Sequence, residues 1–491
     1  MLTLRHPIDL DPDAVERIAW QGVKVRLHDD LLDELNRART AMLDALPGRR
    51  VYGVNTGTGF QAGTDLSPSE QHERQRSLLL GRAVGSAPYL TYGEARAVWT
   101  ARLASLLSGH AGVSTELCVW LVDRLNDGFA PAIPRRSIGC AGEIIPLSHA
   151  FQTILGVGVV VRPDGSTQPA AEALTELGVE PFEPGEKEGI ALLAGSPAAA
   201  ACGLARRRDA LLLANQLSWS AACAIDALRA PLDVYEAEHA ELGGDKVLAR
   251  VLALLRMRLT GSEPARQPLQ APVSFRVAPQ VLTHLERTIA RLGEDVGRTL
   301  GAISDSPAFV GGRFLASGGF HAIEVAASLD ALAAALVRCA ELAGQRVHRL
   351  LDSRFTGLPD QLVASAGGQA GMVVVQKRVA GALNELRRRA FPASVGLTDT
   401  SLGQEDAMTF VFEASENVRE ISSLLRDVVA SELLVSRQAW ALRGERRATG
   451  LGRLAERLIE TVAPLDSDRP LGVDLDRVRL LLADETLFPA S

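Results

Sequence analysis

Long stretches with a helical spacing of apolar residues constrain the fold of this chain more than any other feature of its sequence. They lie in the second half, at residues 197–228, 279–303, 325–351 and 415–442. Apolar residues that recur every three or four positions mark the buried face of a helix. The clearest stripe is Val418, Ile421, Leu425, Val428 and Val429. Helices of about 25 residues or more are typical of bundles, so we predict a mainly α fold with an elongated central helical bundle.

The first 196 residues have a different character from the rest of the chain. Short helical patterns alternate there with clusters of glycine, which mark tight turns and close backbone approaches. We therefore predict a smaller loop-rich region at residues 1–196 and a bundle with C-terminal helices at 197–491. Ser196 and Pro197 match the N-cap and the first position of the first long helix.

Charge and cysteine content narrow the possible functions. The chain has 52 basic and 59 acidic residues, a net charge of −7, so nothing indicates a nucleic-acid or membrane partner. Its five cysteines lack CxxC spacing, and its nine histidines lack the spacing of metal ligands. The first residues contain no apolar signal segment. We expect a cytoplasmic protein with unpaired thiols and no metal site.

Five short segments contain residues of the types that catalysis and substrate binding require. One is a glycine-rich loop that presents Tyr52, one of only four tyrosines in the chain. It lacks the lysine and the strand–loop–helix context of a phosphate-binding loop. Each segment is a weak signal alone, and their order and spacing carry the weight. The segments are 51–59, 137–149, 187–195, 274–280 and 392–406.

Taken in order, these segments resemble those of the aromatic amino acid ammonia-lyases and aminomutases, from about residue 50 to about residue 440. The resemblance implies the helical fold shared with fumarase and aspartase. It implies a homotetramer whose active sites are assembled from loops of three subunits. It also implies that Tyr52 acts as a base and that Arg276 binds the substrate carboxylate. Other substrate-binding positions that it implies are Asn55, Phe320 and Gln404.

The chain departs from this family at the prosthetic group. Members cyclise an internal Ala-Ser-Gly into a methylidene-imidazolone, an electrophile that turns the amino group into a better leaving group. The corresponding residues here are Cys140, Ala141 and Gly142. Alanine has no hydroxyl to eliminate, so we expect no such group and no other cofactor.

Further family positions around the same site have also changed. A histidine is replaced by Arg82, and a second tyrosine and three asparagines are replaced by smaller residues. The smaller residues are Ala194, Val273, Gly301 and Gly319. These changes predict a larger site with fewer hydrogen-bonding groups near the substrate amine. A primary amine would be left with unsatisfied polar protons there, whereas a trimethylammonium group has none to satisfy.

These departures resemble the ergothionase branch of the family, which needs no methylidene-imidazolone. That resemblance implies elimination of trimethylamine from ergothioneine to give thiourocanate. Tyr52 would remove the β-proton and Arg276 would hold the carboxylate. Arg82 would bind the ring sulfur, and Glu405 would contribute negative potential near the ring or the ammonium. Lys187 and Glu188 would tune Tyr52 or bind ring atoms.

Two alternatives remain open from the sequence. One is a lyase without the prosthetic group that acts on another betaine, such as hercynine, which lacks the sulfur. The other is an inactive homologue that serves as a binding protein. Retention of Tyr52, Arg276 and Glu405 argues against the second alternative.

Overall fold

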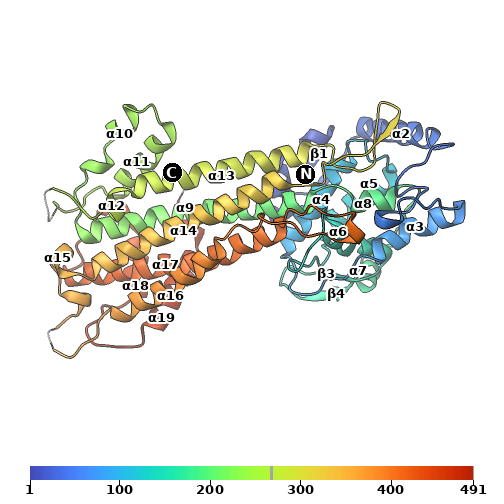
Figure 1. Ribbon diagram of the computed structural model, residues 1–491. Coiled ribbons are helices and arrows are strands. Elements are labelled where there is room, and N and C mark those ends of the chain that lie inside the picture. The colour runs from blue at the N-terminus through green and yellow to red at the C-terminus, as the bar shows by residue number, and fades with distance from the viewer. Residues whose placement is uncertain (266–268, 366, 490–491) are drawn as a thin grey trace. The chain divides into compact units, whose positions relative to one another are not determined.

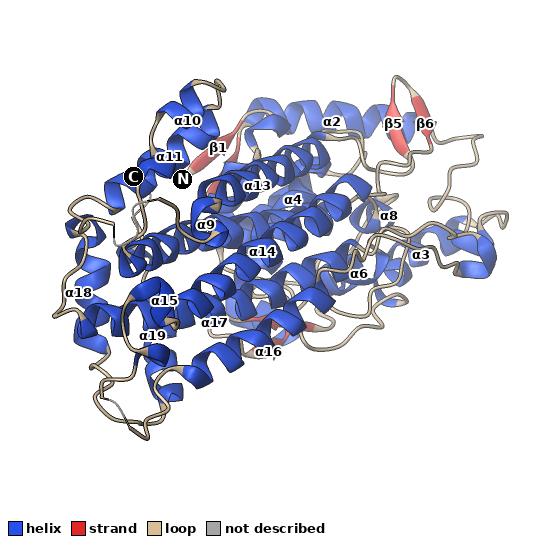
Figure 2. Cartoon of the chain, turned by 60° about the vertical axis from the view of Figure 1, so that its left-hand side comes forward, coloured by secondary structure: helices blue, strands red, loops and turns tan. Residues whose placement is uncertain are grey.

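The structure is a computed structural model that describes residues 1–265, 269–365 and 367–489. Helices account for 60% of the residues and strands for 5%, which confirms the prediction of a mainly α fold. Figures 1 and 2 show long helices, with only short two-stranded sheets. The chain divides into two compact units, and each is discontinuous in sequence. Unit 1 comprises residues 1–206, 292–329 and 392–416, and unit 2 comprises 207–291, 330–391 and 417–491. The predicted division at residue 196 remains a prediction.

Unit 1 contains the described strands and eight complete α-helices. Within it α1 packs on α4, and α3 contacts both α6 and α8. Its complete helices are α1 (Pro12–Gln21), α2 (Asp29–Asp44), α3 (Pro68–Leu80), α4 (Tyr92–Leu106), α5 (Thr115–Asn126), α6 (Ile144–Phe151), α7 (Ala170–Leu177) and α8 (Glu188–Leu193). The strands form the parallel pair β1 (Leu2–Leu4) and β2 (Val25–Leu27), and the antiparallel pairs β3 (Val159–Val161) with β4 (Thr167–Pro169) and β5 (Ala308–Val310) with β6 (Arg313–Leu315).

Unit 2 is helical. Among its helices, α10 packs on α11 and α18 packs on α19. The helices that lie wholly within it are α10 (Glu238–Glu241), α11 (Lys246–Arg258), α12 (Val273–Arg276), α15 (Ser353–Thr356), α16 (Val373–Arg389), α18 (Gly452–Thr461) and α19 (Leu471–Leu482).

Four long helices contribute residues to both units, at the positions that the apolar spacing predicts. They are α9 (Pro197–Leu228), α13 (Ala278–Gly301), α14 (Ile323–Leu350) and α17 (Val411–Leu442). The five residues of the predicted α17 stripe are all fully buried. Within unit 2, side chains of α9, α13 and α14 line one small apolar space. An apolar stretch between Glu188 and Leu228 is long enough to cross a membrane, but 94% of it is buried, as in a core helix.

A buried ion pair joins three of these helices inside unit 2. Arg346 on α14 is 4% exposed, and its Nε lies 2.6 Å from Glu432 Oε1 on α17, a side chain that is fully buried. Ser220 on α9 donates to the other carboxylate oxygen at 2.5 Å. The charge of Glu432 is therefore met by an arginine and a hydroxyl, which offsets the cost of removing it from water.

The start of α9 depends on a residue far away in sequence. Pro197 has no N–H to donate, and the next two amides, of Ala198 and Ala199, both donate to the Glu143 carboxylate at 2.6 Å. Ser196 occupies the predicted N-cap position, since its carbonyl accepts from the Ala200 amide, but its hydroxyl donates to the Gly319 carbonyl and Glu143 supplies the side-chain cap. In its ionised form the Glu143 carboxyl group accepts from both amides, and the positive end of the helix dipole stabilises its charge.

Burial raises the pKa of Glu143 to about 8, against the opposing effect of the two amide hydrogen bonds. Between an ordinary carboxyl pKa near 4.5 and this value, the folded protein binds a proton that the unfolded chain releases. Burial of this group therefore makes folding less favourable as the pH rises through that range.

Replacing either Arg346 or Glu432 alone should lower the free energy of unfolding more than replacing both residues together. We expect Arg346→Met to lower the free energy of unfolding by about 3–5 kcal/mol, because it leaves Glu432 buried without its cation. The double variant Arg346→Met with Glu432→Leu should recover much of that loss. Urea unfolding of the variants measures this, with the exposed pair Arg457 and Glu460 as a control worth less than about 1 kcal/mol. Equal destabilisation of the single and double variants would contradict the prediction.

Glu143→Gln should remove one pH-dependent contribution to stability. Wild type should lose unfolding free energy relative to the variant between pH 4.5 and pH 8, by up to about 1.4 kcal/mol for each pH unit. Urea unfolding of both proteins at several pH values within that range gives the difference directly. The prediction is contradicted if the difference in unfolding free energy between the two proteins stays constant over this range. It is also contradicted if wild type becomes more stable relative to Glu143→Gln as the pH rises.

Candidate active site

The loop that carries Tyr52 lies between α2 and α3 in unit 1, and its own side chains shape it. Asn55 closes the loop, because its Oδ1 accepts from the Val51 amide and its Nδ2 donates to the Arg49 carbonyl, both at 2.6 Å. The Gly59 amide donates to the Tyr52 hydroxyl oxygen at 2.8 Å. This bond fixes the direction of the phenol and stabilises negative charge on its oxygen. The Tyr52 side chain is 41% exposed within one chain.

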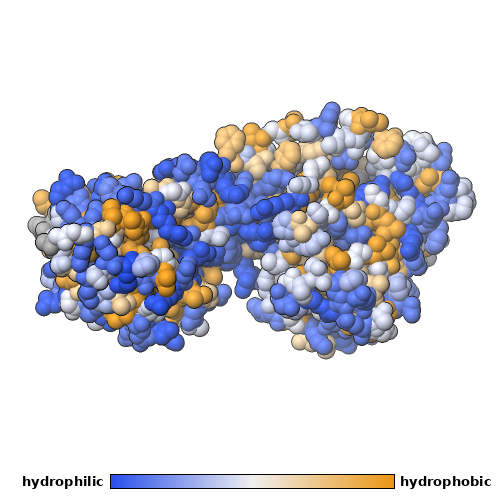
Figure 3. All heavy atoms as spheres, turned by 90° about the horizontal axis from the view of Figure 1, so that it is seen from below, coloured by the Kyte–Doolittle hydropathy of each residue, from blue (hydrophilic) through white to orange (hydrophobic). Residues whose placement is uncertain are grey.

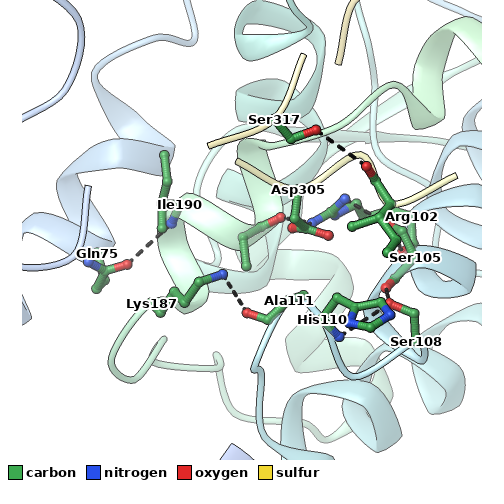
Figure 4. A network of polar contacts seen from close by, with 12 residues as sticks. Gln75, Arg102, Ser105, Ser108, His110, Ala111, Lys187, Ile190, Asp305 and Ser317 are labelled. Carbon is green, nitrogen blue, oxygen red and sulfur yellow. Dashed lines mark hydrogen bonds and ion pairs between the residues drawn. The ribbon is translucent and has the colours of Figure 1, made fainter. Parts of the chain in front are cut away.

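Close packing against α8 explains the first glycine of this loop. Gly53 has a φ of +69°, and a Cβ there would lie 2.9 Å from the Ile190 side chain. Gln75 on α3 links the two segments: its Nε2 donates to the Gly53 carbonyl, and its Oε1 accepts from the Ile190 amide, both at 3.2 Å. Figure 4 shows the second of these bonds. The loop is therefore held against two helices.

Two arginines converge beside Tyr52. Arg74 and Arg82 both donate an Nη2 to Thr58 Oγ1, at 2.8 and 2.9 Å. Burial lowers the pKa of Arg82, the charge of Arg74 lowers it further, and Tyr52 and Glu405 act in the opposite sense. These electrostatic effects place Tyr52, Arg82 and Glu405 in one neighbourhood, as the sequence predicts. Arg74 is absent from the sequence prediction.

The segment Cys140-Ala141-Gly142 lies beside Glu405. The Ala141 amide donates to Glu405 Oε2 at 3.3 Å, and the hydroxyl of Ser401 donates to Oε1 at 3.1 Å. Gln404, the neighbour of Glu405, is exposed within one chain.

The chemistry of this segment does not fit a methylidene-imidazolone. Ala141 offers only a methyl group where the family needs a hydroxyl to eliminate. Cys140 supplies no thiolate, because burial raises its pKa to about 12 and the thiol donates to the Gly142 carbonyl at 2.9 Å. Phe320 covers the segment: its ring lies 3.4 Å from the place that a Cβ on Gly142 would occupy. No reaction step can therefore be assigned to such a group in this chain.

Lys187 and Glu188 occupy the beginning of α8, and both are buried. Lys187 Nζ donates to the Ala111 carbonyl at 2.6 Å (Figure 4), and burial lowers its pKa to about 8. Glu188 Oε1 accepts from the amide and hydroxyl of Ser114, and its Oε2 accepts from the Gly185 amide. Both carboxylate oxygens of Glu188 thus hold neighbouring loops in place.

In contact with α8 lies a fully buried arginine, Arg102 on α4 (Figure 4). It donates to Asp305 Oδ1 at 2.7 Å, to the Ala191 carbonyl, and to the Ser105 hydroxyl at 2.8 Å. The guanidinium joins α4, α8 and the segment after α13, and so holds these parts of unit 1 together next to the site.

The positions that lost side chains do not all leave empty space. At Gly319 a Cβ would lie 2.7 Å from the Ile303 carbonyl oxygen, so the expectation of extra room is wrong at this position. Backbone atoms of Ile303 and Ser304 occupy the volume that a side chain would take. At Gly301 no atom lies within 4 Å of the Cβ position, which leaves that direction open within one chain.

Arg276 lies in unit 2, at the end of α12, whereas the residues around Tyr52 belong to unit 1. Its Nε donates to the Ala271 carbonyl at 3.0 Å. Val273, three residues earlier, is 57% exposed. The carboxylate-binding role of Arg276 remains a prediction.

Sequence reasoning missed two charged residues in this region. Glu143 lies within the segment that provides Cys140, and its acidic side chain in an apolar stretch was the available signal. Arg74 had no comparable signal, because arginines at alternate positions on an exposed helix are ordinary.

The chain is similar to known lyases over nearly all its length. A family model described as "Aromatic amino acid lyase" matches residues 10–463. A histidine ammonia-lyase of Symbiobacterium thermophilum is 31% identical, with 97% of this chain and 96% of the relative covered. A histidine ammonia-lyase of Streptomyces coelicolor is 34% identical, with 87% and 85% covered.

Solved structures agree with these relatives. Ergothionase from Treponema denticola, in complex with desmethyl-ergothioneine sulfonic acid, superposes with a TM-score of 0.93, at 23% identity and with 100% of both chains covered. At this identity the likeness establishes the fold alone. Histidine ammonia-lyase from Trypanosoma cruzi gives a TM-score of 0.88 at 26% identity, with 99% and 94% covered. The predicted ammonia-lyase type of fold is confirmed. The chain is a carbon–nitrogen lyase that belongs to the aromatic amino acid lyase family.

Proposed function

We propose that this lyase eliminates trimethylamine from ergothioneine and releases thiourocanate, without a methylidene-imidazolone. The observation that carries the proposal is the Cys140-Ala141-Gly142 segment, which offers neither a hydroxyl to eliminate nor a reactive thiolate. A lyase without an electrophile requires a substrate whose amine already leaves readily. A trimethylammonium group meets this requirement, because it departs as a neutral amine.

The proton transfer is assigned to Tyr52. The phenolate takes a proton from the β-carbon, the electron pair of that C–H bond forms the Cα–Cβ double bond, and the Cα–N bond breaks with its electrons on nitrogen. The Gly59 amide keeps the phenol oxygen in position, on the loop whose Thr58 accepts from Arg74 and Arg82. The proton then passes from Tyr52 to solvent.

The remaining roles follow from charge. Arg82 binds the ring sulfur, while Glu405, held by Ala141 and Ser401, supplies negative potential for the departing ammonium. Arg276 binds the substrate carboxylate, as an arginine suits a planar anion. Asn55, Lys187 and Glu188 maintain the loops around the site through their hydrogen bonds.

The working form is proposed to be a cytoplasmic homotetramer that uses no cofactor. Apolar side chains gather in patches on the surface shown in Figure 3. Several large apolar residues are more than two-thirds exposed within one chain: Phe391, Val395, Leu397 and Leu402. Contiguous exposed apolar surface favours contacts between subunits.

Turnover of ergothioneine tests the proposal directly. We expect the purified protein to produce the conjugated thiourocanate chromophore together with one equivalent of trimethylamine, and to release no ammonia from histidine. A parallel assay with hercynine, which lacks the sulfur, tests the alternative that this betaine is the substrate. The variant Ala141→Ser should turn over ergothioneine no faster than wild type. Absence of product from ergothioneine at high enzyme concentration rejects the proposed substrate.

The role of Tyr52 has its own test. Tyr52→Phe should lower kcat for ergothioneine by about 10²–10⁴-fold, because the base is removed while the ring remains. Tyr89→Phe is the matched control, since Tyr89 lies in the same unit and has no part in the proposed site, and it should keep the wild-type rate. Circular dichroism establishes that both variants fold. An unchanged rate in folded Tyr52→Phe would show that another group is the base.

A further inference from the structure

The pairing of Arg74 with Arg82 is unusual for two cations. Arg74 belongs to α3 and Arg82 follows the end of that helix, yet one Nη2 from each binds the same oxygen, Thr58 Oγ1. The distance between the two Nη2 atoms therefore cannot exceed the sum of the two hydrogen-bond lengths. Thr58 is itself buried, so water screens the two charges poorly.

Neither arginine forms an ion pair within the part of the chain that the structure describes, although Glu405 acts on Arg82 from a greater distance. In residues 1–265, 269–365 and 367–489, no carboxylate lies within ion-pair distance of either guanidinium. The Arg74 Nε is buried and has no hydrogen-bond partner in that part of the chain. Two partly buried cations that share one neutral acceptor are costly in free energy unless a negative group joins them. The arrangement suits a ligand atom that carries negative charge and accepts several hydrogen bonds.

The pair lies next to the proposed base. Thr58 and Gly59 are consecutive, and the Gly59 amide donates to the Tyr52 hydroxyl oxygen. An acceptor bound by both arginines would therefore lie close to the phenol that removes the β-proton. The sulfur of an imidazole-2-thione fits this description, because resonance with the ring nitrogens concentrates negative charge on it.

We infer that Arg74 and Arg82 together bind the negatively polarised sulfur of the substrate ring, and that Arg74 is a specificity-determining residue for sulfur-bearing over sulfur-free substrates. This inference rests on the proposed function and adds a second sulfur ligand to it. A single arginine at position 82 would serve any polar ring substituent. The second guanidinium is what selects an acceptor with substantial negative charge.

Binding of the product acid tests the inference without any need for turnover. We expect calorimetric titration to show that wild type binds thiourocanate on the order of ten- to a hundred-fold more tightly than urocanate, the same acid without sulfur. Arg74→Met should lose most of this preference, while its affinity for urocanate changes little. Arg74→Lys should retain an intermediate preference, and it replaces Arg74→Met if that variant fails to fold.

Arg76→Met is the matched control. Arg76 lies on the same helix, and its exposed guanidinium pairs with Glu183, so this variant should keep the full preference for the sulfur compound. If Arg74 only holds Thr58 and its loop in place, Arg74→Met should lower the affinity for both acids by the same factor. That result would overturn the inference. Equal binding of the two acids by wild type would overturn it as well. Failure of wild type to turn over ergothioneine, with the binding preference intact, would instead reject the proposed reaction.

Discussion

The fully buried guanidinium of Arg102 is the interaction on which the architecture of unit 1 depends. It binds Asp305 and the Ala191 carbonyl, and so fixes α8 against α4. The Ile190 amide, on the same helix, binds Gln75, which also holds the carbonyl of Gly53 in the loop of Tyr52. The position of the loop backbone beside Tyr52 is therefore linked through hydrogen bonds and α8 to a charge deep in the core. A buried cation can serve in this way only because its partners satisfy most of its donors.

Charge is distributed unevenly around Tyr52. Two arginines lie on one side through Thr58, while Glu405 is held against the Ala141 amide. A zwitterionic substrate with a polarised sulfur and a quaternary ammonium would match both signs. Because the ammonium has no N–H donors, Glu405 would attract it through charge alone, without a directional hydrogen bond.

The long helices and the key loops could be predicted from sequence, whereas the contacts between them could not. A stripe such as that of α17 is local information, since burial of one helix face requires apolar residues at fixed intervals. The motif order likewise predicts site roles for Tyr52, Arg82 and Glu405, and these roles stay predictions. By contrast, the capping of α9 by Glu143 and the convergence of Arg74 on Thr58 join residues that are distant in sequence. Spacing along the chain contains no information about such pairs, and so the local signal gave the N-cap position at Ser196 but not the distant side chain that satisfies the amides.

The structure also changes the reason why a bulky amine should be preferred. The sequence suggested that lost side chains enlarge the site, but the Ile303 carbonyl already fills the space at Gly319. Extra volume is therefore a weaker argument than leaving-group chemistry. The Cys140 thiol donates to the Gly142 carbonyl and its pKa is raised to about 12; as it is not an electrophile, it does not take over the role of the missing group. With no electrophile available, a primary amine gains no activation from this segment, so in the proposed reaction selectivity would follow from how readily the substrate nitrogen leaves unaided.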